Sequence, residues 1–238
     1  MGSVVSRLRA EPPALHGGGT AFWGTGWGAL VWLEETLRPG MATLETGAGA
    51  TTIVFAASGA DHEAVTPSQD EVDRIAQECE RLGVDQSRVR YHVAPSQDVL
   101  SELERRELDV VLVGGADGFP YPILDWWYLA PRLRVGGHLL VDAAYNPAAS
   151  ALAAHLRTDP AWRVLDVLGY KTVLAQKTAD TPPRALYAGD PAIGRLSFAY
   201  LPPLRRLRAS ARHRLFTTRA GLAAVELVRS RAGWLFRD

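Results

Sequence analysis

The sequence contains very little lysine and a single cysteine. Of its 26 basic residues only Lys171 and Lys177 are lysines, and the others are arginines. The lone thiol of Cys79 has no partner in the chain for a disulfide, which predicts a reducing, cytoplasmic location. The sequence also lacks the run of roughly 20 apolar residues that a transmembrane helix requires. These absences, with 47% apolar residues in a chain of 238, predict a soluble globular protein with one sizeable core.

The net charge of zero hides an asymmetry along the chain. Residues 184–238 carry 11 arginines and three acidic residues, a net of +8, so the preceding residues carry a net of −8. Apolar residues recur in this basic tail at helical spacing, which predicts two helices. We favour a tail that packs on the acidic body and does not bind nucleic acid. Weak contact with an anionic membrane surface and pairing of two subunits remain open.

Between residues 22 and 178 the pattern alternates between strand and helix. Such alternation predicts an α/β domain built as a doubly wound, Rossmann-like, mostly parallel seven-stranded sheet with helices on both faces. Residues 1–21 would precede it as an N-terminal segment that can act as a lid, and residues 179–238 would follow as a basic helical extension. The predicted strands are 41–45, 62–67, 88–93, 108–115, 136–143, 162–168 and 171–177, and the predicted helices are 28–37, 51–58, 68–83, 96–106, 123–133 and 147–158.

A glycine-rich turn, Gly47-Ala48-Gly49, follows the first predicted strand. It has no adjacent lysine, which argues against a phosphate loop. It also lacks the third glycine of a dinucleotide site, and the second strand ends in Thr66-Pro67-Ser68 without the acid that binds a ribose. S-adenosylmethionine has no phosphates, and its ammonium could be balanced by Glu45 just before the turn. The sequence therefore favours S-adenosylmethionine as the ligand.

Two segments, "TLETGAGATTIVFAASGADHEAVTPS" and "ADGFPYPILDWWYLAPRLRVGGHLLVDA", resemble the class I S-adenosylmethionine-dependent methyltransferases, specifically their bacterial small-molecule branch. The resemblance covers about residues 22–177. It implies that S-adenosylmethionine is the cofactor, and it places the ribose and the adenine near the turns after the second and third strands. Trp23 and Trp27 could close over the cofactor or pack in the core. The implied cofactor-binding residues are Glu45, Gly47, Ala48, Gly49, Thr66, Ser68, Ser96, Gln97 and Trp23.

The resemblance fails where metal-dependent relatives carry carboxylates. Here Gly114 and Ala143 stand at those two strand ends and offer no side-chain oxygen, so we expect no catalytic metal. Asp117, in the loop after the fourth strand, is the first candidate for a general base, although it could equally be a turn residue. Asp142 and Tyr145, after the fifth strand, are the next candidates.

These observations predict a methyltransferase that acts on a small molecule, with transfer to oxygen and without a metal. The alternative is a catalytically silent, methyltransferase-like binding or scaffold protein, in which Gly114 and Ala143 mark lost chemistry. Two further residues are less informative. His138, at the start of a buried strand, is expected in the core, and His16 lies in the segment that can act as a lid.

Overall fold

The structure, a computed structural model, describes residues 3–17, 24–180, 202–205, 207–208 and 211. The chain divides into two compact units, residues 1–193 and 194–238. In the second unit, residues 203–205, 207–208 and 211 are helical. Most of the predicted basic extension, with its open alternatives, lies outside the described residues. Within the described residues, no helix combines the length and the apolar character needed to cross a membrane.

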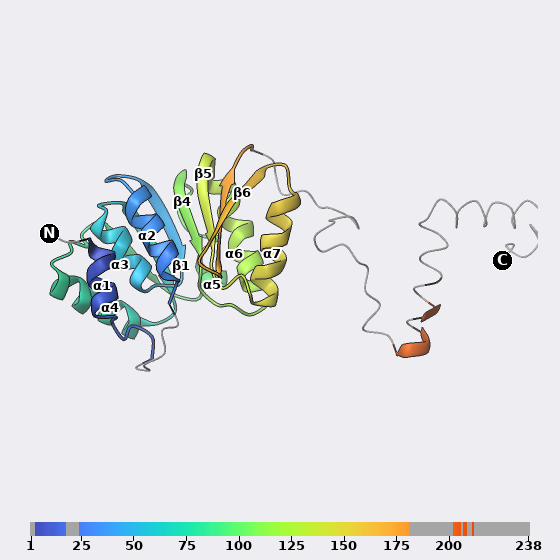
Figure 1. The fold of residues 1–238 in the computed structure, drawn as a ribbon, viewed down its shortest axis with the longest axis horizontal. Coiled ribbons are helices and arrows are strands. Elements are labelled where there is room, and N and C mark those ends of the chain that lie inside the picture. The colour runs from blue at the N-terminus through green and yellow to red at the C-terminus, as the bar shows by residue number, and fades with distance from the viewer. Residues whose placement is uncertain (1–2, 18–23, 181–201, 206, 209–210, 212–238) are drawn as a thin grey trace, which may run out of the picture. The chain divides into compact units, whose positions relative to one another are not determined.

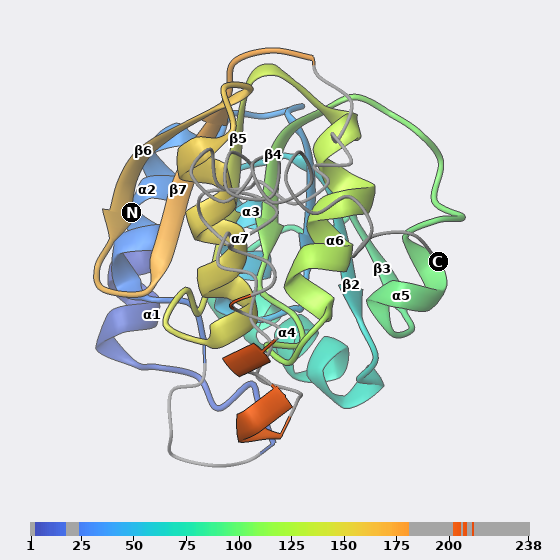
Figure 2. The same cartoon turned by 90° about the vertical axis from the view of Figure 1, so that its right-hand side faces the viewer.

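The first unit contains a seven-stranded sheet in the order β3-β2-β1-β4-β5-β7-β6 (Figures 1 and 2). Neighbours among the first five strands pair in parallel, whereas β7 pairs antiparallel with both β5 and β6. This arrangement confirms the predicted mostly parallel, Rossmann-like sheet. The strands are β1 (Ala42–Thr46), β2 (Asp61–Thr66), β3 (Val89–Val93), β4 (Leu108–Val113), β5 (Leu133–Val141), β6 (Trp162–Leu168) and β7 (Thr172–Lys177).

Helices cover both faces of the sheet, and each face has its own apolar cluster. A parallel sheet needs this cover because each crossover carries a helix that buries one face of its strands. One face holds α1 (Val4–Ala10), α2 (Trp27–Thr36), α3 (Ala50–Ala57) and α4 (Gln69–Leu82); the other holds α5 (Ser96–Val99), α6 (Tyr121–Leu129), the 3₁₀ turn η1 (Ala130–Arg132) and α7 (Pro147–Thr158) (Figure 1).

Helix α4 illustrates how closely local sequence can determine an element. Ser68 caps its N-terminus by accepting a 3.2 Å hydrogen bond from the backbone N–H of Glu71, and Gly83 ends it in a left-handed conformation at φ 62°. Its apolar stripe includes Ile75 and Cys79, both fully buried. Burial raises the pKa of the Cys79 thiol to about 11, so this cysteine is an unreactive core residue.

One local prediction was wrong because tertiary contacts determine the chain path. The predicted helix over residues 96–106 ends at Val99, since Arg106 is drawn back to the sheet, where it donates to the carbonyl of Asp61 at 2.8 Å and pairs with Glu63 at 2.9 Å. An unpredicted helix, α1, also lies within the segment expected to be a lid. Val5 and Leu8 bury its apolar side in the core, so only the chain after α1 is placed to cover a site.

Candidate functional site

The glycine-rich turn lies where the strand order reverses, between β1 and β4. Gly47 has a φ of 86°, and its N–H donates to the carbonyl of Val65 at 2.8 Å. A Cβ atom on Gly47 would lie 2.7 Å from the carbonyl oxygen of Gly114, which directly follows β4. Only glycine tolerates both the positive φ and this backbone approach. The sequence therefore uses glycine here to bring two strand ends together at a position where open α/β sheets bind ligands.

A small cavity opens at this turn. Its volume of about 50 Å³ is far below the roughly 300–1,000 Å³ of pockets that enclose small molecules. A ligand of cofactor size therefore has to displace some of the wall. The cavity brings predicted cofactor-binding residues together with the predicted catalytic Asp142, and its lining comprises His16, Gly24, Thr25, Glu45, Thr46, Gly47, Ala48, Gly49, Ala50, Thr51, Leu112, Gly114 and Asp142.

His16 forms the part of that wall contributed by the chain after α1. Its Nε2 atom would lie 3.0 Å from a Cβ atom on Gly49, so the imidazole packs directly on the glycine turn. Its Nδ1 atom lies 3.0 Å from Oε1 of Glu71, and Nε of Arg74 donates to the carbonyl of Leu15 at 2.7 Å. These two contacts attach the segment to α4. The segment thus lies over the turn, and its action as a lid stays a prediction.

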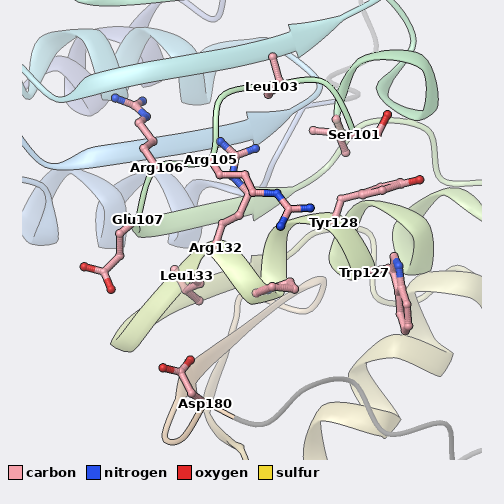
Figure 3. A pocket seen from close by; sticks show the side chains of 12 residues that line it. Ser101, Leu103, Arg105, Arg106, Glu107, Trp127, Tyr128, Arg132, Leu133 and Asp180 are labelled. Carbon is pink, nitrogen blue, oxygen red and sulfur yellow. The ribbon is translucent and has the colours of Figure 1, made fainter.

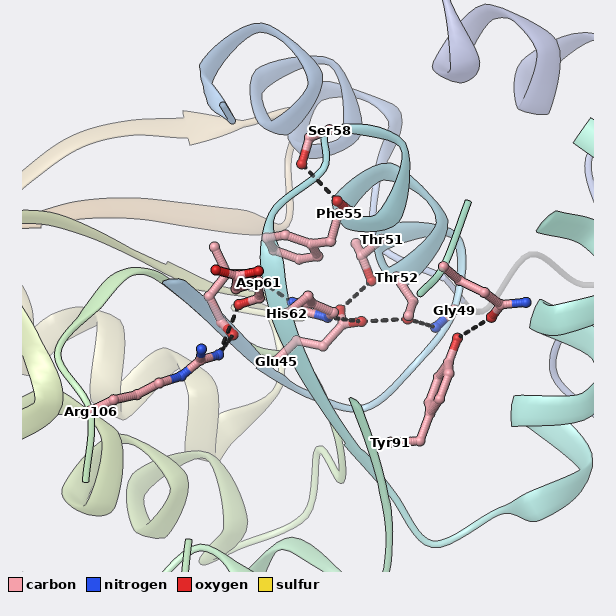
Figure 4. A network of polar contacts seen from close by, with 12 residues as sticks. Glu45, Gly49, Thr51, Thr52, Phe55, Ser58, Asp61, His62, Tyr91 and Arg106 are labelled. Atoms are coloured by element: carbon pink, nitrogen blue, oxygen red, sulfur yellow. Dashed lines mark hydrogen bonds and ion pairs between the residues drawn. The ribbon is translucent and has the colours of Figure 1, made fainter. Parts of the chain in front are cut away.

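Glu45 sits at the centre of a buried polar network (Figure 4). Its carboxylate accepts hydrogen bonds from the hydroxyls of Thr51, at 2.5 Å, and Thr52, and it lies 3.2 Å from Nε2 of His62. The backbone N–H of Gly49 donates to the Thr52 hydroxyl at 2.9 Å. Glu45 therefore fastens the start of α3, and with it the glycine turn, to β1. Glu45 also lines the cavity, so it stays a predicted partner for a ligand ammonium.

The predicted ribose contacts lie together at the end of β2. The Thr66 hydroxyl donates to Oε2 of Glu71 at 2.8 Å, and Glu71 is the residue that holds His16. Ser68 lies in the same turn, where its side chain caps α4. Thr66, Ser68 and the His16 segment thus form one connected group beside the glycine turn.

The predicted adenine contacts lie at α5, and they include a neighbour that the sequence did not indicate. Ser96 and Gln97 are both half-buried there. The fully buried carboxyl group of Asp125, on α6, lies close to the hydroxyls of Ser96 and Thr46. Burial raises the pKa of Asp125, while these two hydroxyls oppose the shift. The sequence pattern placed Asp125 within a predicted helix but gave no sign that its carboxyl group would be buried.

Replacing Asp125 by asparagine should stabilise the protein at neutral pH. The raised pKa means that folding opposes ionisation of Asp125, so the cost is absent below the ordinary pKa of an aspartate and complete above the raised one. We expect Asp125→Asn to increase the free energy of unfolding by about 1 kcal/mol at pH 7 and by nothing at pH 3.5 or below. Urea denaturation at both pH values would measure this, and a gain of equal size at acid pH would contradict it.

Polar side chains from three loops meet beside the cavity, at the ends of β4 and β5 and before β7. Asp142 accepts a 2.5 Å hydrogen bond from the Thr172 hydroxyl through Oδ1, and its Oδ2 lies 3.6 Å from Nζ of Lys171. Lys171 is mostly buried and also donates to the carbonyl of Gly24 at 2.6 Å. Asp117 belongs to the same group, since the charges of Asp142 and Lys171 and the side chain of Asn146 all influence its pKa.

The environment of Asp117 raises its pKa although the loop surface is open to solvent. The first cause is desolvation by the surrounding protein, the second is the nearby carboxylate of Asp142, and Lys171 and Asn146 oppose both. A carboxylate with a raised pKa is a stronger base, as a proton acceptor near neutral pH requires.

Tyr145, the remaining predicted catalytic residue, lies three residues after Asp142 in the chain. It is 60% exposed, and its ring is stacked on that of Tyr170 at a centroid distance of 6.4 Å.

Sequence reasoning missed Lys171 and Thr172, which lie about 30 residues from Asp142. Their proximity follows from the antiparallel pairing of β5 with β7, in which Val141 faces Val173. The scarcity of lysine was the only sequence signal, since Lys171 is one of two. His138, expected in the core, is half-buried and packs edge-on against Trp32 at 5.2 Å.

The structure describes one of the two tryptophans that the sequence singled out, and it allows a search for metal ligands among the described residues. Trp27 begins α2 and packs, partly buried, against the first apolar cluster, as in the core alternative, whereas Trp23 lies outside the described residues. In the part of the chain that the structure describes, no three His, Cys, Asp or Glu side chains are grouped to hold a metal ion. Metal-free catalysis stays a prediction.

Comparison with solved structures identifies the fold. The O-methyltransferase TomG of Streptomyces achromogenes, solved with S-adenosylmethionine, aligns at a TM-score of 0.54 and 17% identity, over 74% of this chain and 87% of its own. The Podospora anserina methyltransferase PaMTH1, bound to S-adenosylhomocysteine, aligns at 0.56 and 17%, over 74% and 86%. The chain has a methyltransferase fold.

The acceptor varies among proteins with this methyltransferase fold. A Streptococcus thermophilus rRNA methylase also aligns, at a TM-score of 0.51 and 15% identity, over 63% of this chain and 95% of its own. No family model and no curated protein matches the sequence. The fold alone therefore does not decide between a small molecule and RNA, and the argument has to come from the site.

Proposed function

We propose that this protein is an S-adenosylmethionine-dependent methyltransferase that acts on oxygen of a small molecule without a catalytic metal. The observation that carries the proposal is the glycine turn at the β1–β4 switch point, where bare backbone at Gly47 and Gly114 adjoins the carboxylate of Asp142. The solved structures with this fold that hold S-adenosylmethionine or S-adenosylhomocysteine support the choice of cofactor.

The residues around the turn fit this cofactor. Glu45 suits an ammonium, and the glycine turn, which has no adjacent lysine, suits a nucleoside without phosphates. Thr66, Ser68, Ser96 and Gln97 are the proposed ribose and adenine contacts. When bound, the cofactor supplies an electrophilic methyl group on a sulfonium. Asp117, with its raised pKa, accepts the proton of the acceptor hydroxyl, and Asp142 and Lys171 orient that hydroxyl.

Two features support a small, metal-independent acceptor site. The cation beside Asp142 is the ammonium of Lys171, and the other oxygen of Asp142 is occupied by Thr172, so its charge is already compensated. The glycine turn and the Asp142 group lie in residues 1–183, whose net charge of −8 disfavours a long phosphate backbone at this site, while the +8 of the chain lies in residues 184–238. The catalytically silent alternative draws its support from the small cavity beneath His16.

Calorimetry and turnover assays separate these possibilities. We expect binding of S-adenosylhomocysteine to the full chain, and methyl transfer to members of a panel of phenols and sugars that persists in a metal chelator. Binding without transfer to any acceptor would favour the silent alternative, and no binding at all would overturn the proposal. Loss of transfer with the chelator, restored by a divalent ion, would contradict the metal-free part alone.

The pH profile tests the role of Asp117. Activity should rise as pH increases through the raised pKa of Asp117, and Asp117→Asn should remove this rise and lower kcat by about 100-fold or more. Lys171→Met should move the rise to higher pH, since the lysine charge lowers the pKa of Asp117. Asp98→Asn, at an exposed position on α5, is the matched control and should leave the profile unchanged. An unaltered profile in Asp117→Asn would exclude it as the base.

A further inference from the structure

A second cavity, of about 480 Å³, lies away from the glycine turn (Figure 3). Its walls include Glu107 and Leu133, which stand at the beginnings of β4 and β5, whereas the glycine turn lies at the carboxyl ends of the strands. The volume is within the roughly 300–1,000 Å³ range of pockets that enclose small molecules. None of the residues proposed above for cofactor binding or methyl transfer lines this cavity.

Arg132, which lines the cavity, is only 8% exposed. Its Nη2 donates to the carbonyl of Glu104 at 2.7 Å, but its buried Nε and Nη1 atoms have no hydrogen-bond partner among the described residues. A buried guanidinium with unpaired N–H groups is costly unless an acceptor compensates it. Burial accordingly lowers the pKa of Arg132.

Two further arginines add positive charge around Arg132. Arg105 and Arg106 also line the cavity, and the charges of both act on Arg132. The carboxylate that offsets them, Glu63, is already paired with Arg106 at 2.9 Å and with His92 at 2.9 Å. Glu63 therefore leaves the Nε and Nη1 atoms of Arg132 without a direct partner, although Glu107 lies on the same wall.

Acidic Asp180 at the rim does not correct this excess, because Lys177 pairs with it at 2.7 Å. The rest of the wall is mostly apolar and includes two aromatic rings. Trp127 is 51% exposed, an unusual state for so large an apolar ring, and Tyr128 lies next to it on α6. Figure 3 shows Arg105 and Arg132 near the middle of the view with both rings to one side. Such rings offer a stacking surface for a flat group.

We propose that this cavity binds a small molecule that carries a phosphate group next to a planar ring. Arg132 and Arg105 receive the phosphate, since guanidinium forks match its oxygens in geometry and charge. Trp127 stacks on the ring. The cavity is thus a second ligand site, distinct from the place of methyl transfer.

Titration of the full chain with inorganic phosphate and with phenyl phosphate tests this site. The reporter is the indole N–H resonance of Trp127 in a nitrogen–proton NMR spectrum, assigned by its disappearance in Trp127→Phe. We expect both compounds to shift this resonance, with a Kd for phenyl phosphate at or below about 1 mM and weaker binding of phosphate alone. Phenol, which has the ring without the charge, should not shift it.

Arginine variants locate the phosphate. Arg132→Met should weaken phenyl phosphate binding by about 10-fold or more, and Arg105→Gln, at an exposed position whose replacement spares the fold, by about three-fold or more. Arg90→Gln, an exposed arginine on β3, is the matched control and should bind like the parent protein. An unshifted Trp127 resonance at about 20 mM phenyl phosphate, or equal affinity in Arg105→Gln and the parent, would overturn the proposal, as would an equal shift by phenol.

Discussion

Gly47→Ala is expected to destabilise the protein by about 3 kcal/mol and to weaken S-adenosylhomocysteine binding by more than 10-fold. The new Cβ atom would lie 2.7 Å from the carbonyl oxygen of Gly114 and 3.1 Å from Cα of Gly115, and both neighbours are backbone that cannot rotate away. The φ of 86° adds a conformational cost to the overlap. Relief requires β1 and β4 to separate at the switch point, which would distort the turn that we propose holds the cofactor.

Gly83→Ala separates the two contributions to this effect. Gly83 also has a left-handed backbone, at φ 62°, but a Cβ atom there would meet nothing within 4 Å. This control should lose only about 1 kcal/mol of stability and should bind S-adenosylhomocysteine normally. Thermal unfolding and calorimetry on both variants measure the difference. Equal stabilities for the two variants would show that the close approach of Gly47 to Gly114 does not contribute to the loss of stability in Gly47→Ala.

Glu45→Gln is expected to lower stability and cofactor affinity together. An amide cannot accept hydrogen bonds from Thr51, Thr52 and His62 as a carboxylate does, and its own N–H₂ group would face hydroxyl donors. Breaking such a buried network costs about 2–4 kcal/mol. The start of α3 would loosen with it, so the glycine turn would lose its support.

The two measurements also distinguish the roles open to Glu45. If its main role were to balance a ligand ammonium, Glu45→Gln would weaken S-adenosylhomocysteine binding at nearly unchanged stability. If it mainly fastens α3, both should fall. Glu35→Gln, at an exposed position on α2, controls for the loss of one negative charge and should change neither quantity. Unchanged stability and unchanged affinity in Glu45→Gln would remove both roles.

Much of the site could be located from strand ends alone. Parallel strands bring their carboxyl ends to one edge of a sheet, so predicting the strands was enough to expect the glycine turn and Asp142 near each other, and both line one cavity. The predicted helix through residue 106 failed for the opposite reason. Its local pattern was helical, but Arg106 makes contacts with β2 that no local pattern encodes.

The sequence by itself determined the alternation of strands and helices, the cap and the end of α4, and the requirement for glycine after β1. Each depends on neighbouring residues, through side-chain periodicity or allowed backbone angles. Only the tertiary structure decided that Glu45 turns to His62, that Lys171 reaches Asp142, that His16 covers the turn and that Arg132 is buried beside a cavity. These contacts join residues that are distant in sequence. Strand register and loop paths determine them, and local periodicity contains no information about either.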